Sequence, residues 1–342
     1  MKSSFYIDES RDGRYAATHV PLLLRHCWLN VSGLRVHLLA AGNQGRPVLV
    51  LHGGGLDAAG LSFGSTIRVL AEQHRVFAPD WPGFGESDAM PATWRVEECV
   101  EFLARLLEAL GLKRASLVGV SMGGGFTLGF TIRAPEKVDR LVLVNSVGLG
   151  REIPGGFLSY FAMRLPLVDE LRWALMIRSR TLARRILCAA LVNRKEALNG
   201  EVLDEIIRLA RRAGAGAAFR QLQRSEYQWQ GLRTNYSQRL SEVRVPTLIV
   251  HGAQDRIVPV SWAQRAHNLI KNSRLEIIRR CGHMPPIEQP EVFNEIVRRF
   301  LLGPGQSRFS ELYRACRSMA YHGFRIRSLL PLRNSPSPPG RA

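Results

Sequence analysis

The chain has 342 residues, of which 46% are hydrophobic and 22% are charged, so it is long enough for one large core or for a core with a smaller insert. Its net charge of +18 raises the question of a nucleic-acid partner, but the sequence has no arginine-rich helix interleaved with aromatic residues and no nucleic-acid motif, and we expect none. No run of 18 apolar residues occurs, and residues 1–15 lack the apolar stretch of a secretory signal, which predicts a cytoplasmic protein.

The first predicted elements are short apolar runs that alternate with a helical pattern. Strands are predicted at residues 35–41, 47–53, 75–80, 115–120 and 140–145. The last four are nearly continuous apolar runs, as in strands that are buried on both faces. Residues 93–112 predict a helix with Thr93 as N-cap and Gly111 near its end. Strands that alternate with helices predict an α/β fold with a mostly parallel sheet flanked by helices.

The alternation stops near residue 149 and resumes near residue 246. Residues 149–240 contain helical patterns and no strand-like run, which predicts an all-helical insert. Two strands and two helices follow, at residues 246–255, 261–271, 274–280 and 290–302. We therefore expect one core in two parts, residues 1–148 and 241–302, with the insert between them.

Residues 303–342 form a basic extension beyond the last predicted helix. Apolar residues from Phe309 to Met319 predict one amphipathic helix, and the composition of residues 335–342 predicts disorder. Residues 149–244 hold 17 basic and 9 acidic side chains, and residues 303–342 hold 7 and 1, so these two segments supply +8 and +6 of the net charge. Either the extension packs on the core with a solvated basic face, or it associates weakly with an anionic membrane surface. The oligomeric state is not predicted.

The cysteines are odd in number and form no Cys-x-x-Cys pair: Cys27, Cys99, Cys188, Cys281 and Cys316. This spacing argues against a disulfide framework and against a zinc site. We expect buried thiols and no metal or organic cofactor.

Residues 119–123, Gly-Val-Ser-Met-Gly, match the pattern G-x-S-x-G directly after a predicted strand and before a helical run. This context predicts a sharp strand-to-helix turn that exposes Ser121 as a nucleophile. Gly119 and Gly123 lack the bulk that would keep the strand and the helix apart.

A serine nucleophile needs a base and a carboxylate that orients the base. His283 lies in a loop between the last predicted strand and the last predicted helix, and Asp255 follows the preceding strand. Because the carboxyl ends of parallel strands meet at one edge of a sheet, we expect these side chains to converge on Ser121.

An oxyanion that forms during acyl transfer needs backbone N–H donors. Residues 52–55, His-Gly-Gly-Gly, end an earlier predicted strand, and the glycines let the backbone approach a substrate carbonyl. We assign the donors to Gly54 and Met122, with Gly53 and Gly55 shaping the loop and His52 orienting it through hydrogen bonds.

These motifs and their order, Ser, Asp, His, resemble the α/β-hydrolase superfamily over about residues 30–302. Residues 80–88, Asp-Trp-Pro-Gly-Phe-Gly-Glu-Ser-Asp, are similar to a loop of that family, and the insert is similar to its helical cap. The resemblance implies the same fold and the triad of Ser121, Asp255 and His283. Epoxide hydrolases and haloalkane dehalogenases of the superfamily carry an aspartate at the nucleophile position, so Ser121 argues against both.

Residues 52–55, 121–124 and 145–150 look like the branch that contains the meta-cleavage product hydrolases, which cut carbon–carbon bonds in ring-fission dienoates. That group usually has asparagine before the nucleophile and tryptophan after the catalytic histidine, where this chain has Val120 and Met284. Because both changes remove polar groups that would hold an anionic substrate end, we expect an ester or a lactone with an apolar body as the substrate. Carbon–carbon hydrolysis is the alternative, and a non-catalytic ligand-binding member of the fold is a third hypothesis.

The remaining polar residues near these motifs have structural interpretations. We expect Asp80, Asp88 and Glu288 to fix loops, Asn145 to be structural or to line the substrate site, and His251 to be a hydrogen-bonded core histidine. Most apolar residues of the insert, such as Phe157, Tyr160, Phe161, Trp173, Leu175 and Met176, should pack, and some should line the pocket.

Overall fold

The computed structural model describes residues 6–8, 24–152 and 178–303, and the chain divides into two compact units, residues 1–298 and 299–342. The predicted extension therefore lies almost entirely outside the described residues. The same is true of the apolar insert residues 157–176 and of Cys316.

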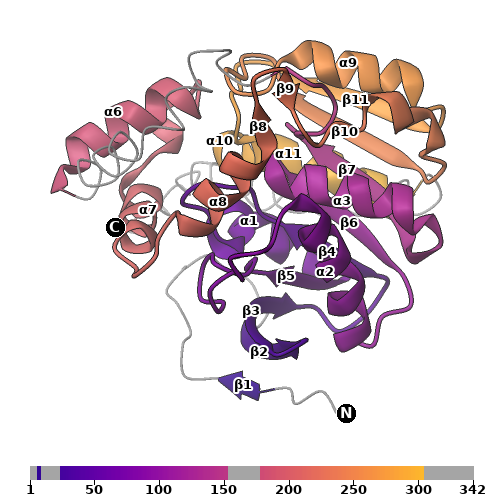
Figure 1. Ribbon diagram of the computed structural model, residues 1–342, viewed down its shortest axis with the longest axis horizontal. Helices are drawn as coiled ribbons and strands as arrows, with labels where there is room; N and C mark the ends of the chain where they lie inside the picture. The colour runs from indigo at the N-terminus through magenta and orange to yellow at the C-terminus, as the bar shows by residue number, and fades with distance from the viewer. Residues whose placement is uncertain (1–5, 9–23, 153–177, 304–342) are drawn as a thin grey trace, which may run out of the picture. The chain divides into compact units, whose positions relative to one another are not determined.

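A twisted sheet runs through the first unit (Figure 1). Within the described residues it has nine strands: β1 Tyr6–Asp8, β2 Arg25–Val31, β3 Leu34–Ala41, β4 Pro47–Leu51, β5 Arg75–Pro79, β6 Ala115–Val120, β7 Val138–Val144, β10 Thr247–Gly252 and β11 Ser273–Ile278. Their order is β1-β2-β3-β5-β4-β6-β7-β10-β11. The strands from β5 to β11 in this order are parallel, and β1, β2 and β3 join them through antiparallel pairing. The predicted α/β fold with a mostly parallel sheet is confirmed.

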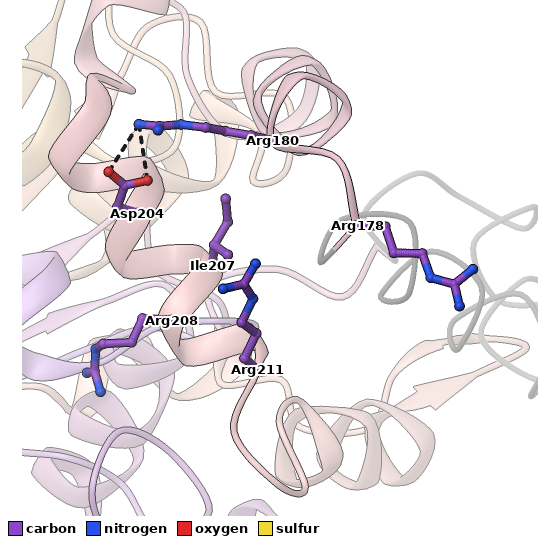
Figure 2. Close-up of a pocket in the computed structure, with 6 residues that line it drawn as sticks. All are labelled: Arg178, Arg180, Asp204, Ile207, Arg208 and Arg211. Atoms are coloured by element: carbon purple, nitrogen blue, oxygen red, sulfur yellow. Dashed lines mark hydrogen bonds and ion pairs between the residues drawn. The ribbon is translucent and has the colours of Figure 1, made fainter.

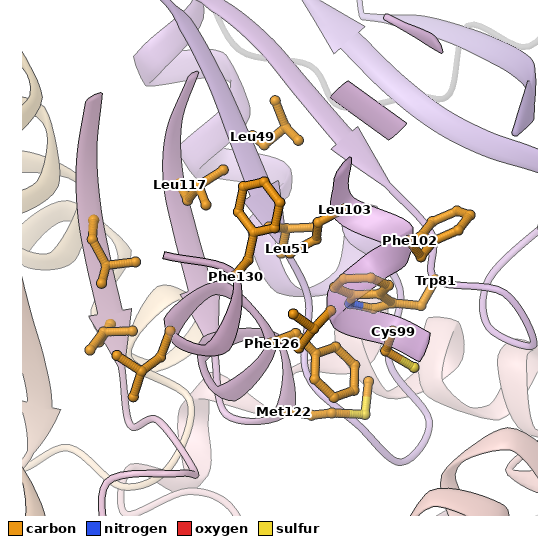
Figure 3. Close-up of a cluster of buried hydrophobic side chains, with 14 of the residues drawn as sticks. Leu49, Leu51, Trp81, Cys99, Phe102, Leu103, Leu117, Met122, Phe126 and Phe130 are labelled. Carbon is orange, nitrogen blue, oxygen red and sulfur yellow. The ribbon is translucent and has the colours of Figure 1, made fainter. Parts of the chain in front are cut away.

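Alternate residues of the central strands point to opposite faces of the sheet, and both faces are buried. Leu49 and Leu51 of β4 lie in one apolar cluster, whereas Val48 and Val50, which alternate with them, are also fully buried. This is why the sequence of each central strand reads as an apolar run rather than as an alternation. Figure 3 shows aromatic rings and leucines packed between the sheet and two helices on one face.

Helices connect the strands: α1 Ala59–Ala71, α2 Val96–Ala109, α3 Met122–Arg133, α9 Val260–Leu269, α10 Pro285–Glu288 and α11 Pro290–Leu302, with a 3-10 turn at Pro135–Lys137. Phe102 of α2 and Phe130 of α3 pack in the cluster of Figure 3. Phe63 of α1 packs against Phe293 of α11, with ring centroids 6.5 Å apart.

The predicted N-cap of α2 is wrong. The helix begins at Val96 rather than next to Thr93, because the Glu98 carboxylate accepts the N–H of Arg95 at 2.7 Å and closes the first turn there. The predicted end is confirmed: Gly111 has φ +65°, a left-handed conformation that glycine adopts at low cost.

The insert is mainly helical where the structure describes it. It contains α6 Arg180–Ala190, α7 Gly200–Ala210 and α8 Ala217–Glu226, with 3-10 turns at Lys195–Ala197 and Ser237–Glu242. A two-stranded hairpin, β8 Tyr227–Gln228 and β9 Gly231–Leu232, follows α8, so the expectation of an all-helical insert is wrong at this point. These strands of two residues are too short to leave a periodic pattern.

The structure also describes the cysteines, the apolar character of the helices and the grouping of possible metal ligands. The four described cysteines, Cys27, Cys99, Cys188 and Cys281, are buried free thiols as expected. Among the described residues, no helix is both long and apolar enough to cross a membrane. No group of three or more His, Cys, Asp or Glu side chains in the described part of the chain could hold a metal ion.

Phe102→Ala should lower the free energy of unfolding by about 3–5 kcal/mol, because the ring is fully buried and packs against Trp81 and Trp94. Urea unfolding followed by circular dichroism measures the change. Ile277→Ala is the control, since this β11 side chain is 40% exposed and its loss should cost less than about 1 kcal/mol. Equal losses in the two variants would contradict the proposed core.

Candidate active site

Ser121 lies on the sharp turn that the motif predicts. It directly follows β6 and precedes α3, and its φ of +52° and ψ of −114° are strained for a residue with a side chain. The turn is possible because glycines occupy two positions where there is no room for a Cβ atom. A Cβ atom on Gly119 would meet the carbonyl oxygen of Gly123, and one on Gly123 would meet the carbonyl oxygen of Leu51. The backbone therefore holds the Ser121 hydroxyl at the carboxyl edge of the sheet.

Three side chains that are far apart in the sequence meet at this edge. His283 Nε2 lies 2.9 Å from Ser121 Oγ, and His283 Nδ1 lies 2.8 Å from Asp255 Oδ2. Asp255 follows β10, and His283 lies in the loop between β11 and α10. The order of hydroxyl, imidazole and carboxylate is the one in which a base can take the serine proton and a carboxylate can stabilise the resulting imidazolium.

Asp255 is held as an ionised acceptor. Its carboxylate is fully buried, which opposes ionisation, but the charge of His283 and their hydrogen bond outweigh burial and lower the pKa of Asp255 below its usual value. Backbone N–H groups of Ile257 and Val258 donate to Oδ1 at 2.7 and 3.1 Å and act in the same direction. His251 Nε2 lies 3.0 Å from the Val258 carbonyl oxygen, so this core histidine has the hydrogen bond that the sequence predicts. Burial lowers the pKa of His251.

Asn145 connects two loops, residues 253–259, which carry Asp255 and are called the acid loop, and residues 279–284, which carry His283 and are called the histidine loop. Its Nδ2 donates to Asp255 Oδ2 and to the carbonyl oxygen of Gly282, at 3.0 Å for the second bond, and its Oδ1 accepts the N–H of Gly252 at 3.1 Å. Its φ of +43° is another strained conformation at the end of a strand, β7. Of the two roles expected for Asn145, these contacts support the structural one.

The loop at residues 52–55 is fixed by its own hydrogen bonds. His52 Nε2 accepts the N–H of Trp81 at 3.0 Å, so its Nδ1 carries the proton and donates to the carbonyl oxygen of Gly53 at 2.8 Å. The N–H of Gly53 donates to Asp57 at 2.8 Å. Within the described residues, the N–H groups of Gly54 and Met122 have no acceptor, which leaves them available for an oxyanion.

Asp57 is a further residue of the site, and no sequence motif predicts it. Its carboxylate is buried and accepts the N–H groups of Gly53 and Ala58 and the hydroxyl of Ser62. Burial raises the pKa of Asp57, and the proximity of His52 opposes that shift. Nothing in the sequence marks this acid except its position four residues after Gly53.

Gly54 lies directly under the insert. A Cβ atom on Gly54 would collide with the ring of Phe219 from α8, so the ring packs on this glycine. Gly55 has φ +79° and open space around it. The insert thus contacts the loop that carries one of the candidate oxyanion donors.

Asp80 fixes the loop at residues 80–88, as the sequence analysis expects. It accepts the N–H groups of Ala59 at 2.8 Å and Glu86 at 2.9 Å, and it lies 2.8 Å from His37 Nδ1. Burial opposes its ionisation, but the bond to His37 and the nearby charge lower the pKa of Asp80 to about 2. Asp88 likewise accepts the N–H of Arg35 at 2.7 Å.

The model of the alpha/beta hydrolase fold family matches residues 46–290. The chain belongs to this family. It is 32% identical over 275 residues to a 2-hydroxy-6-oxo-2,4-heptadienoate hydrolase of Pseudomonas putida, a match that covers 78% of this chain and 91% of that protein.

Solved structures of similar enzymes extend the comparison. A serine hydrolase involved in carbazole degradation, the CarC enzyme, superposes with a TM-score of 0.68 at 28% identity, over 81% of this hydrolase and 98% of that chain. A thermophilic esterase from Thermogutta terrifontis superposes with a TM-score of 0.61 at 25% identity, over 80% and 95%. The similar proteins thus include a dienoate hydrolase and an esterase.

A pocket of about 480 Å³ lies between α6 and α7 of the insert and contains none of the three converging side chains (Figure 2). Its lining residues are Arg178, Arg180, Asp204, Ile207, Arg208 and Arg211. Arg180 is paired with Asp204, and Arg208 is paired with Glu205 and Glu86, so carboxylates already neutralise part of its charge. This pocket is therefore separate from the cluster of Ser121, His283 and Asp255.

Asp255→Asn should lower kcat by about 10⁴-fold, because an amide neither selects the Nδ1–H tautomer of His283 nor stabilises its cation. Steady-state rates on any turned-over substrate measure the effect, with circular dichroism as a check of folding. Asp88→Asn, in a loop that does not contact His283, is the control and should retain wild-type kcat. A loss of less than tenfold in Asp255→Asn would contradict the role of the carboxylate.

Asp80→Asn should lower stability in a pH-dependent way. Because the folded-state pKa of Asp80 is about 2 and the unfolded value is about 4, its ionisation contributes roughly 2 kcal/mol above pH 4, which is lost as the pH falls through 2. Urea unfolding of wild type and variant at several pH values measures this difference. A difference that stays constant from about pH 7 to about pH 2.5 would contradict the depressed pKa.

Proposed function

We propose that this protein is a serine hydrolase that cleaves a carbon–carbon bond beside a ketone in a 2-hydroxy-6-oxo-dienoate. The observation that carries the proposal is the Ser121–His283–Asp255 geometry, in a chain that is similar to a dienoate hydrolase over 91% of that enzyme's length. The sequence alone favours an ester, and the similarity to dienoate hydrolases favours carbon–carbon hydrolysis instead.

The first steps use the triad. His283 Nε2 takes the proton of Ser121 Oγ, or of a water bound beside it, as the new oxygen–carbon bond forms at the 6-oxo carbon. The Asp255 carboxylate stabilises the imidazolium. The N–H groups of Gly54 and Met122 would bind the oxyanion, and the positive end of α3 adds to the field there.

The second part of the reaction expels a carbon leaving group. In the 2-oxo tautomer of the substrate, cleavage of the C5–C6 bond moves the electron pair through the C3–C4 double bond to the 2-oxo oxygen, which His283 can then protonate. Water supplies the hydroxyl that remains on C6. The products are a carboxylic acid from C6 and a 2-hydroxydienoate.

Ester hydrolysis is the second candidate, and two side chains favour it. Val120 and Met284 flank Ser121 and His283 in sequence, and both are buried and apolar where dienoate hydrolases usually have asparagine and tryptophan. A buried carboxylate of a dienoate would find no hydrogen bond from either side chain. The same triad and oxyanion donors would serve an ester, with an alkoxide as the leaving group.

The kcat/KM for a 2-hydroxy-6-oxo-heptadienoate should be at least about 100-fold above that for p-nitrophenyl esters of two to eight carbons. The reason is that contacts with the non-reacting part of the true substrate help to stabilise its transition state. Absorbance follows both reactions, with Ser121→Ala as the blank. Ester turnover that exceeds dienoate turnover would replace the proposal with the esterase. No turnover of either substrate, with no labelling by a fluorophosphonate, would favour a non-catalytic member of the fold.

A further inference from the structure

Glu288 occupies the seam between the histidine loop and the insert. Its side chain is only 4% exposed and lies in α10, five residues after His283. One carboxylate oxygen, Oε1, accepts the N–H of Gly282 at 2.8 Å and more weakly that of Met284 at 3.4 Å. These two residues flank His283, so Glu288 holds the backbone on both sides of the base.

The other carboxylate oxygen holds the insert. Oε2 accepts the N–H groups of Asn193 at 2.7 Å and Arg194 at 3.1 Å, in the segment that follows α6. The N–H of His283 itself donates to the carbonyl oxygen of Leu191 at 2.7 Å. The N–H groups of the three consecutive residues 282–284 therefore all donate either to Glu288 or to the insert.

The fit at this seam leaves no free space. A Cβ atom on Gly282 would lie 2.8 Å from the Leu191 carbonyl oxygen, 2.9 Å from the Asn193 nitrogen and 3.0 Å from Glu288 Oε1. The acid loop is attached to the same end of α6, because Arg256 donates to the carbonyl oxygen of Ala189 at 2.9 Å. The base and the acid of the triad are thus both connected to one end of an insert helix.

We propose that Glu288 is a positioning residue that couples the seating of the insert on the core to the placement of the His283 imidazole. The proposal rests on the serine-hydrolase part of the proposed function and does not depend on the substrate. When residues 191–194 are in place, both arms of the Glu288 carboxylate are used and His283 lies within hydrogen-bond distance of Ser121. When they are displaced, the N–H of His283 loses the Leu191 carbonyl oxygen and Glu288 loses both donors of its Oε2, so that the base moves away from the nucleophile.

Glu288→Gln tests the coupling with almost no change in size. Four backbone N–H groups donate to the carboxylate, two to each oxygen, and the Cys281 thiol also hydrogen-bonds to it, so the amide nitrogen of glutamine must face one pair of N–H groups and break that arm. Gly282→Ala perturbs the same seam independently, since its methyl group separates the loop from the insert. Glu291→Gln, on the exposed side of α11, is the matched control.

The readout is inactivation by a fluorophosphonate, in which Ser121 Oγ forms a bond to phosphorus, His283 takes the serine proton and fluoride leaves. We expect the limiting rate, kinact, of Glu288→Gln and Gly282→Ala to fall about 10- to 100-fold with KI within about threefold of wild type, because displacement of a catalytic group slows the chemical step rather than binding. Melting temperature and near-UV circular dichroism establish whether each variant is folded. If Glu288→Gln does not fold, the kinact of Gly282→Ala decides the test.

Two results would overturn the coupling: a folded variant with wild-type kinact, or the same loss of kinact in Glu291→Gln. A change in KI alone would assign the seam to binding and also reject the proposal. If wild type is labelled but does not turn over dienoates, the substrate proposal fails and this test remains valid. If wild type is not labelled while properly folded, the serine-hydrolase proposal and the coupling both fail.

Discussion

The close passage of β6 and α3 is the constraint on which the site depends. The two elements meet at Ser121, and they can do so only because the positions that face each other carry no Cβ atom. The serine pays for this arrangement with a left-handed φ of +52°. Because the surrounding sheet is buried on both faces, the strained turn cannot relax without loss of the packing shown in Figure 3.

A second theme is the use of a buried carboxylate to hold each of four loops at the same edge of the sheet. Asp57 holds the loop after β4, Asp80 the loop after β5, Asp255 the loop after β10 and Glu288 the loop after β11. Each accepts at least two backbone N–H groups. Loops carry the reacting groups, and these carboxylates give the loops the rigidity that general-base chemistry needs.

The sequence predicted the parts of the molecule whose cause is local. Apolar runs located the central strands, and the turn at Ser121 was readable because glycine and serine have fixed roles there. The position of His283 and Asp255 after consecutive parallel strands followed from topology alone. Their convergence to within 2.9 and 2.8 Å needed the structure.

Other parts depend on distant contacts and could not be read. Helix α1 contains Gly60, Gly64, serine and threonine, which are weak helix formers, and it is stabilised by packing on the sheet. Thr93 looked like an N-cap, but the N-cap is Arg95, two residues later, where the Glu98 carboxylate accepts the N–H of Arg95. Asp57 belongs to no motif, and Val120 and Met284 indicate the polarity next to Ser121 and His283 but do not identify a substrate.

The most direct test of the account is the location of the covalent adduct after reaction with a fluorophosphonate. Intact-mass analysis followed by peptide sequencing should find one phosphonyl group per chain, on Ser121, and no adduct in Ser121→Ala. This result would establish Ser121 as the activated nucleophile at the turn between β6 and α3. An adduct on another residue, or none on folded wild-type protein, would contradict the central claim.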